Sequence, residues 1–172
     1  MVGFVYDREL KKCVIHSDTQ SDAVYIRRVI EILSELHAFP PDFRFTSIQL
    51  LMNAEVVRHR DKNGGWSLGI ALGDFTGGSY VQEGVPIDIW HKPTLLDGSR
   101  EHWVTPAEGN RMSLVIYPHK HFVTTASPCL AAVLESLGFR IPDIPHTENR
   151  VRRLVSLLCL RPPLPRRVAR SF

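Results

Sequence analysis

The chain contains 172 residues, of which 44% are hydrophobic and 23% are charged, and its formal net charge is +3. These values are typical of an ordinary globular protein, and they exclude a fibrous or an intrinsically disordered chain. The length is that of one domain with a sizeable core. We expect this domain to span residues 1–160, followed by a basic tail rich in proline and arginine at residues 161–172. Such a tail either contacts nucleic acid or acidic lipid or, more commonly, is only solvated.

The N-terminus and the cysteines indicate an intracellular protein, in the cytoplasm or the nucleus. Asp7 comes too early for the apolar core of a signal peptide to form before it. The apolar run at residues 154–160 is too short to cross a bilayer, so we expect no transmembrane segment. Cys13, Cys129 and Cys159 contain no CxxC pair, so we expect reduced thiols rather than a disulfide framework or a structural zinc site.

The first predicted element is a helix at residues 22–37. Hydrophobic side chains recur at helical spacing from Ile26 to Leu36, while arginine and glutamate residues occupy the other faces. Pro40 and Pro41 end the pattern, because proline cannot continue a helix. We expect the apolar side of this helix to pack against the rest of the domain.

From residue 43 to residue 118 the chain changes to short β-type runs, separated by turn-forming pairs such as Gly77-Gly78 and Asp97-Gly98. Eight strands are predicted, at residues 45–52, 56–61, 67–72, 79–82, 87–90, 94–96, 102–105 and 111–117. A series of short strands of this kind is typical of a double-sheet jelly roll, the cupin-like double-stranded β-helix. Residues 43–118 would form this core.

Two further helices are predicted after the strands. Ser127 is an expected N-cap with Pro128 at the first helical position, and Gly138 can end the helix. Thr147 is the expected cap of a second helix that includes residues 151–160. Both helices would cover the outside of the β-barrel, which gives a mostly β fold with flanking helices, of the α+β class.

The first candidate site is the His-x-Asp sequence formed by His59 and Asp61. Alternate residues of a strand point to the same face, so we expect the two side chains to lie close together. One imidazole and one carboxylate on a common face make two-thirds of a 2-His-1-carboxylate facial triad, which binds non-haem Fe(II) and leaves other positions open. Alone, His-x-Asp is weak evidence, because it occurs by chance in many chains.

The second half of the pattern is His102, which opens a late strand, followed nine residues later by Arg111. Arg111 and Ser113 are two apart and would share a face of the last predicted strand. A guanidinium can bind a carboxylate with two parallel hydrogen bonds, and a serine hydroxyl can add a third. We expect this strand to pair with the strand of His102, which would put an anion clamp close to the metal.

In this order, His59-x-Asp61, His102 and Arg111-x-Ser113 resemble the signature of the 2-oxoglutarate/Fe(II)-dependent dioxygenase superfamily. The neighbouring sequences HRDKN at residues 59–63, LGDFTGG at 72–78 and LLDG at 95–98 are similar to those of small algal and protist members. The resemblance covers roughly residues 47–117. It implies a double-stranded β-helix in which the catalytic residues His59, Asp61 and His102 hold Fe(II). Arg111 and Ser113 would bind the far carboxylate of 2-oxoglutarate.

The implied reaction is hydroxylation or demethylation of an unidentified substrate, with consumption of O2 and decarboxylation of 2-oxoglutarate to succinate. One departure from the family is the short segment of forty residues between Asp61 and His102, which has no obvious insertion for a substrate lid. Substrate recognition would then fall to residues 63–66, residues 84–90 and the N-terminal region.

Two other functions stay open at this stage. A compact core without a lid is similar to the thymine and 5-methylcytosine hydroxylase branch of the superfamily, and the basic tail would suit such a nucleobase-oxidising enzyme. A non-catalytic, cupin-like module that binds a metal or ligand is the other alternative.

Several residues also have simpler interpretations. His59 could be a surface histidine of a strand, and Arg111 could be the ion-pair partner of a nearby glutamate. His119 and His121 form a second His-x-His pair, but no carboxylate lies beside them in the sequence. Asn53 and Asn63 are candidates for a hydrogen bond to a ligand, with a role in a turn or strand end at least as plausible.

Overall fold

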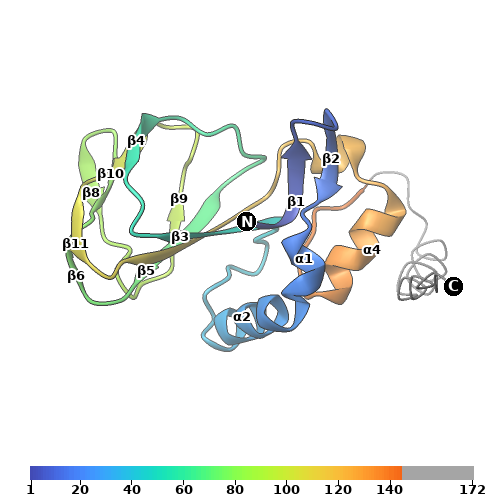
Figure 1. Cartoon of the computed structure of the whole chain (residues 1–172), viewed down its shortest axis with the longest axis horizontal. Coiled ribbons are helices and arrows are strands. Elements are labelled where there is room, and N and C mark those ends of the chain that lie inside the picture. The colour runs from blue at the N-terminus through green and yellow to red at the C-terminus, as the bar shows by residue number, and fades with distance from the viewer. Residues whose placement is uncertain (145–172) are drawn as a thin grey trace, which may run out of the picture.

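The computed structural model describes residues 1–144, which form antiparallel β sheets with a few short helices (Figure 1). The largest sheet has six strands in the order β2-β1-β3-β12-β5-β9. Its strands are β1 (Val2–Asp7), β2 (Lys12–Ile15), β3 (Ser47–Met52), β5 (Ser67–Leu72), β9 (Thr94–Leu96) and β12 (Met112–Tyr117). Every neighbouring pair in this sheet is antiparallel.

A second sheet has four strands in the order β4-β10-β7-β8, and a third has only two. The four strands are β4 (Val56–His59), β7 (Tyr80–Gln82), β8 (Val85–Ile87) and β10 (His102–Val104). The two-stranded sheet pairs β6 (Phe75–Gly77) with β11 (Ala107–Gly109). Within residues 1–144 the strand ladders keep the three sheets separate, so they do not join into a closed barrel.

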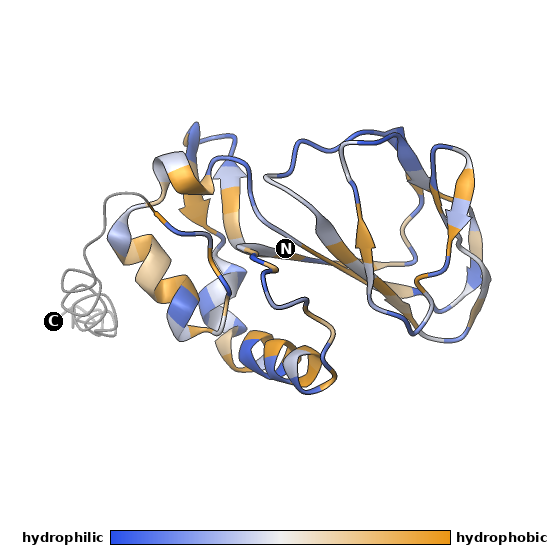
Figure 2. Cartoon of the chain, turned by 180° about the vertical axis from the view of Figure 1, so that it is seen from behind, coloured by the Kyte–Doolittle hydropathy of each residue, from blue (hydrophilic) through white to orange (hydrophobic). Residues whose placement is uncertain are grey.

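The helices gather at the end of the molecule that holds β1 and β2, away from β4, β8 and β10 (Figure 1). They are α1 (Asp18–Ser21), α2 (Ala23–Glu35), α3 (Phe122–Thr125) and α4 (Pro128–Ser136). Hydrophobic and hydrophilic residues alternate along α2 as an amphipathic helix requires (Figure 2). Its buried residues join the main core, where Ile30 and Leu134 pack with Phe4, Phe45 and Ile116. The helices at this end therefore pack against the six-stranded sheet and form the main hydrophobic core with it.

Much of the expected element pattern is confirmed. The helix predicted at 22–37 is α2, and Ser127 caps α4, where its Oγ accepts a hydrogen bond of 3.3 Å from the amide of Leu130. Strands β5 and β9 have the predicted bounds. The helix expected at 151–160 and the basic tail lie outside the described residues.

Three expectations are wrong or incomplete. The strand predicted at 87–90 is instead β8, which ends at Ile87, and Trp90 forms only an isolated bridge with Ala71. The N-terminal hairpin β1–β2, which extends the large sheet, was not predicted. Cys13 is a free thiol as expected, but Cys129 is disulfide-bonded, contrary to the expectation of reduced thiols throughout.

Among the described residues, the structure contains no helix that is long and apolar enough to cross a membrane.

Candidate metal and anion site

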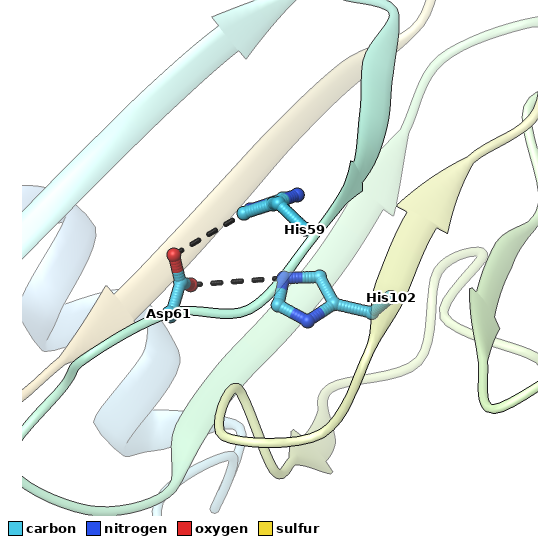
Figure 3. Close-up of side chains that lie close together, drawn as sticks. All are labelled: His59, Asp61 and His102. Atoms are coloured by element: carbon cyan, nitrogen blue, oxygen red, sulfur yellow. Dashed lines mark ion pairs between the residues drawn. The ribbon is translucent and has the colours of Figure 1, made fainter.

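The structure brings His59, Asp61 and His102 together (Figure 3). His59 is the last residue of β4, and His102, the first residue of β10, lies directly opposite it in the ladder. Asp61 lies in the loop after β4, where its amide donates a hydrogen bond of 2.7 Å to the carbonyl of Gly98. One potential ligand atom from each side chain lies within 4.8 Å of the others, so all three could bind a single metal ion.

The nitrogen and oxygen atoms of this group already face one another. Asp61 Oδ1 is 3.5 Å from His59 Nε2, and Asp61 Oδ2 is 3.7 Å from His102 Nε2. The centroids of the two imidazole rings are 4.3 Å apart. His102 is buried, whereas 37% of the side-chain surface of His59 and of Asp61 is exposed. One side of the cluster is therefore held by protein and the other is accessible.

The hydrogen bonds of the two histidines define which ring nitrogen is available to a metal. His59 Nδ1 is 2.8 Å from the carbonyl oxygen of Val57, and His102 Nδ1 is 2.8 Å from that of Arg100. A carbonyl oxygen can only accept, so each Nδ1 must carry the proton. In the neutral imidazole the lone pair is then on Nε2, the atom that faces Asp61 on both rings.

A second layer of contacts holds Asp61 in place. Asn63 donates from Nδ2 to Asp61 Oδ2 over 3.4 Å and to Ser67 Oγ over 3.1 Å. Gly98 approaches so closely that a Cβ atom there would lie 3.1 Å from the Cβ of Asp61. Asn63 therefore positions a candidate metal ligand, which is a different role from the ligand contact considered from the sequence.

The loop before β10 fixes the carbonyl that orients His102. Asp97 accepts hydrogen bonds from the amide and hydroxyl of Ser99, and Arg100 bonds to the carboxylates of Asp97 and Glu83. The hydrogen bond from the Ser99 hydroxyl is the main cause that lowers the pKa of Asp97. Arg100, whose carbonyl oxygen contacts His102 Nδ1, is thus held through its side chain by two carboxylates. The sequence indicated a turn at Asp97-Gly98, but it contained no signal for this function.

Arg111 is the largest of the side chains with under 2% relative exposure, and it lines the same cavity as the three candidate ligands. Its Nε donates to the carbonyl of Gly78 and its Nη1 donates to Ser113 Oγ, each over 3.1 Å. Its amide donates to Asn53 Oδ1 over 2.7 Å. The guanidinium carbon lies 5.6 Å from the centre of the Phe75 ring. Asn53 therefore closes the end of β12 rather than facing a ligand.

The guanidinium of Arg111 has no carboxylate partner within 4.0 Å in the part of the chain that the structure describes. Burial lowers the pKa of Arg111, because removal from water disfavours its charged form. A buried cation without a counter-ion costs several kcal/mol as an order of magnitude, and such a cost is typical of a site that receives an anion. The alternative that Arg111 pairs with a nearby glutamate is wrong.

The expected pairing of the Arg111 strand with the His102 strand is also wrong. Strand β12, which follows Arg111, pairs with β3 and β5, whereas β10 belongs to the four-stranded sheet. The two sheets instead line a common cavity of about 400 Å³, with Arg111 and Ser113 contributed by one sheet and His59 and His102 by the other. The expected anion clamp and the candidate metal ligands therefore line one cavity from two different sheets.

Tyr80 also lines the cavity and was not singled out from the sequence. It is buried, and its ring stacks on the imidazole of His102, with ring centroids 5.4 Å apart and an angle of 25° between the planes. Burial raises the pKa of Tyr80 well above its usual value, and the charges of Asp61 and Asp97 raise it further. The hydroxyl therefore keeps its proton and can donate a hydrogen bond.

His59, Asp61 and His102 are the only cluster of potential metal ligands within residues 1–144. The rings of His119 and His121 lie 5.7 Å apart, but no carboxylate joins them to form a comparable group. No protein-family model and no curated protein matches the chain.

Proposed function

We propose that the chain is a non-haem Fe(II), 2-oxoglutarate-dependent dioxygenase. One observation carries this proposal: a 2-His-1-carboxylate cluster and a buried, unpaired arginine line the same cavity. Two imidazoles and one carboxylate on one side of a metal leave positions free for a chelating co-substrate and for oxygen. Zinc binds similar donors, but a neighbouring anion clamp is the feature that a keto acid with a second carboxylate requires.

The fold is consistent with this assignment. In a jelly roll, two antiparallel sheets face each other and enclose a site between them. A cavity lined from both a six-stranded and a four-stranded sheet fits that description. We propose that the chain is a small, open member of the double-stranded β-helix class, extended at one edge of the large sheet by the hairpin β1–β2.

Each residue has a separate role in the proposed reaction. His59, Asp61 and His102 would hold Fe(II) through Nε2 and carboxylate oxygens, as the proton positions on the two rings allow. Arg111 would neutralise the far carboxylate of 2-oxoglutarate. Ser113 Oγ accepts from Arg111, so its own hydroxyl proton is free to donate to the same carboxylate. The iron, when bound, would supply the activation of O2 that amino-acid side chains cannot provide.

The overall stoichiometry is one 2-oxoglutarate, one O2 and one substrate C–H group converted to succinate, CO2 and a hydroxylated substrate. Hydroxylation of an N-methyl group would lead on to demethylation. The basic tail that motivated a nucleobase substrate lies outside the described residues.

Production of succinate tests the proposal. The purified protein is incubated aerobically with Fe(II), ascorbate and 2-oxoglutarate, and succinate is quantified by mass spectrometry without any prime substrate, so that only uncoupled turnover is measured. We expect slow succinate release that requires Fe(II) and is absent in His102→Ala. A non-catalytic, cupin-like module would bind the metal and yet release no succinate above the level of His102→Ala.

A further inference from the structure

Tyr80 lines the cavity from the same four-stranded sheet as His59 and His102. It lies on β7, which pairs with β10 on the side away from β4, and its cross-strand partner is Val104. Paired residues of an antiparallel ladder direct their side chains to the same face of the sheet, so Tyr80 shares the cavity face with Val104 and His102. Stacking of its ring on His102 fixes the direction of the side chain.

The hydroxyl of Tyr80 has no hydrogen-bond partner among the residues described. Gln82 Oε1 is the one enclosed side-chain nitrogen or oxygen atom in residues 1–144 that lacks a partner. The Tyr80 hydroxyl is not enclosed in this way, although its residue is buried, and the residue lines the cavity. A buried phenol normally finds a partner for its O–H group, and none of the described residues supplies one here.

The position of the ring indicates which part of a ligand the hydroxyl meets. It stacks on the imidazole of the candidate ligand His102, and β7 and β10 are neighbours in the same sheet. Arg111, by contrast, is held on the opposite sheet by Gly78 and Ser113. Tyr80 therefore lies on the metal side of the cavity, on the sheet opposite the clamp for the far carboxylate.

We propose that Tyr80 is a ligand-binding residue whose hydroxyl donates a hydrogen bond to the metal-bound keto acid end of the co-substrate. This inference rests on the proposed function, since it assumes a keto acid that chelates the metal. The hydrogen bond would orient the chelate and would add affinity at the end of the molecule that Arg111 does not reach. A donor to a charged acceptor of this kind contributes more than a neutral one.

Tyr80→Phe tests the inference, because it removes the hydroxyl and keeps the ring that stacks on His102. The matched control is Tyr117→Phe, whose hydroxyl instead contacts Met1 Sδ at 3.6 Å and does not line the cavity. Three quantities are measured anaerobically for the wild type and both variants. They are the affinity for Fe(II) alone, the affinity of the Fe(II)-loaded protein for 2-oxoglutarate, and the wavelength of the visible charge-transfer band at saturation.

We expect Tyr80→Phe to bind Fe(II) as the wild type does and to bind 2-oxoglutarate about ten- to a hundredfold more weakly, as for one hydrogen bond to a charged group. The band should also shift at saturation, since the lost bond acts on the chelated end. Tyr117→Phe should match the wild type in all three quantities.

If Tyr80→Phe binds 2-oxoglutarate as tightly as the wild type and its band is unshifted, the inference about Tyr80 is overturned, whereas the proposed function is not. Weaker binding with an unshifted band would also overturn it, because the hydroxyl would then act at another part of the ligand. Loss of Fe(II) binding in Tyr80→Phe would show that the residue supports His102 instead. If the wild type itself binds Fe(II) but no 2-oxoglutarate, the proposed function fails, and the inference fails with it.

Discussion

His59 and His102 lie opposite each other on β4 and β10, and each ring is bonded through Nδ1 to the carbonyl two residues before it in the chain. The two bonds have the same length, 2.8 Å. They hold both imidazoles as the tautomer that presents Nε2, and they orient both toward Asp61. This repeated arrangement leaves Nε2 of both rings available to a metal.

Removal of any one of the three candidate ligands should abolish tight metal binding. We expect His59→Ala, Asp61→Ala and His102→Ala each to weaken the affinity for Fe(II), or for Zn(II) as a redox-inert probe, by at least about a hundredfold, because two donors cannot replace three. Isothermal titration of the metal-free protein measures this. His121→Ala, which removes an exposed histidine outside the site, is the control and should bind as the wild type does.

Metal binding should also stabilise the fold, because the ligands come from two strands and a loop. At a free metal concentration about a hundredfold above the dissociation constant, the free energy of unfolding should rise by about 2.7 kcal/mol. Thermal unfolding in the presence and absence of a chelator measures the difference. An unchanged midpoint in the wild type would contradict the site, and an equal shift in His102→Ala would show that the metal binds elsewhere.

We expect Arg111 to increase the affinity for 2-oxoglutarate but to lower, or leave unchanged, the free energy of unfolding of the ligand-free protein. Arg111→Met replaces a buried, unpaired cation with an apolar side chain of similar length, so the free energy of unfolding of the ligand-free protein should stay the same or rise by up to about 2 kcal/mol. The affinity for 2-oxoglutarate should fall by about 2–5 kcal/mol, as expected when a buried charge loses its partner. Chemical denaturation and titration calorimetry measure the two effects. A large loss of stability with unchanged affinity would make Arg111 a structural residue only.

Gly78 should be required for the position of Arg111. Its φ of 62° is in the left-handed region, and a Cβ atom there would lie 2.7 Å from Arg111 Cδ. Gly84 has a similar φ of 84°, but a Cβ atom there would have no neighbour within 4 Å. Gly84→Ala should therefore cost about 1 kcal/mol of stability from the backbone alone, and Gly78→Ala about 1–3 kcal/mol more. Only Gly78→Ala should weaken 2-oxoglutarate binding; equal effects of the two variants would contradict the packing argument.

Because the pKa of His119 is lowered in the folded protein, the free energy of unfolding should fall in mild acid. Burial is the main cause that lowers its pKa, and the charges of His121 and Lys120 lower it further. The unfolded chain then binds a proton that the folded chain does not, so the stabilising effect is complete above the ordinary histidine pKa and is lost as the pH falls below it. Denaturation of the metal-free protein at about pH 7.5 and about pH 5.5, on either side of that pKa, should show a smaller decrease for His119→Gln than for the wild type. His121→Gln should keep most of the decrease; an identical decrease in the wild type and His119→Gln would contradict the assignment.

The sequence predicted which residues form the candidate site better than it predicted how the strands and loops position them. The five residues that were singled out by type and order, His59, Asp61, His102, Arg111 and Ser113, all line the same cavity. Two of the expected structural explanations were wrong. Asp61 lies in a loop, where its amide bonds to Gly98, rather than in a strand, and β12 does not pair with β10. Strand pairing between distant segments depends on which faces must be buried together, and alternation within one strand does not specify it.

The missed elements have similar physical causes. Strands β1 and β2 enclose a charged turn, and their hydrophobic pattern is interrupted by Gly3, whose φ is 94°. Strands β6 and β11 have only three residues each and contain glycine, so their own β propensity is weak. They pair because the folded core brings them together. The contacts of Tyr80 with His102 and of Asn63 with Asp61 likewise form only after β7 and the loop after β4 are in place.

The most direct test of the central claim is an anaerobic titration of the metal-free protein with Fe(II) and then with 2-oxoglutarate, followed by visible absorption. We expect a weak charge-transfer band that appears only when both are present, and that is lost in His59→Ala and Asp61→Ala. Absence of the band in the wild type, or its persistence in these two variants, would contradict the assignment of His59, Asp61 and His102 as the iron site of a 2-oxoglutarate-dependent dioxygenase.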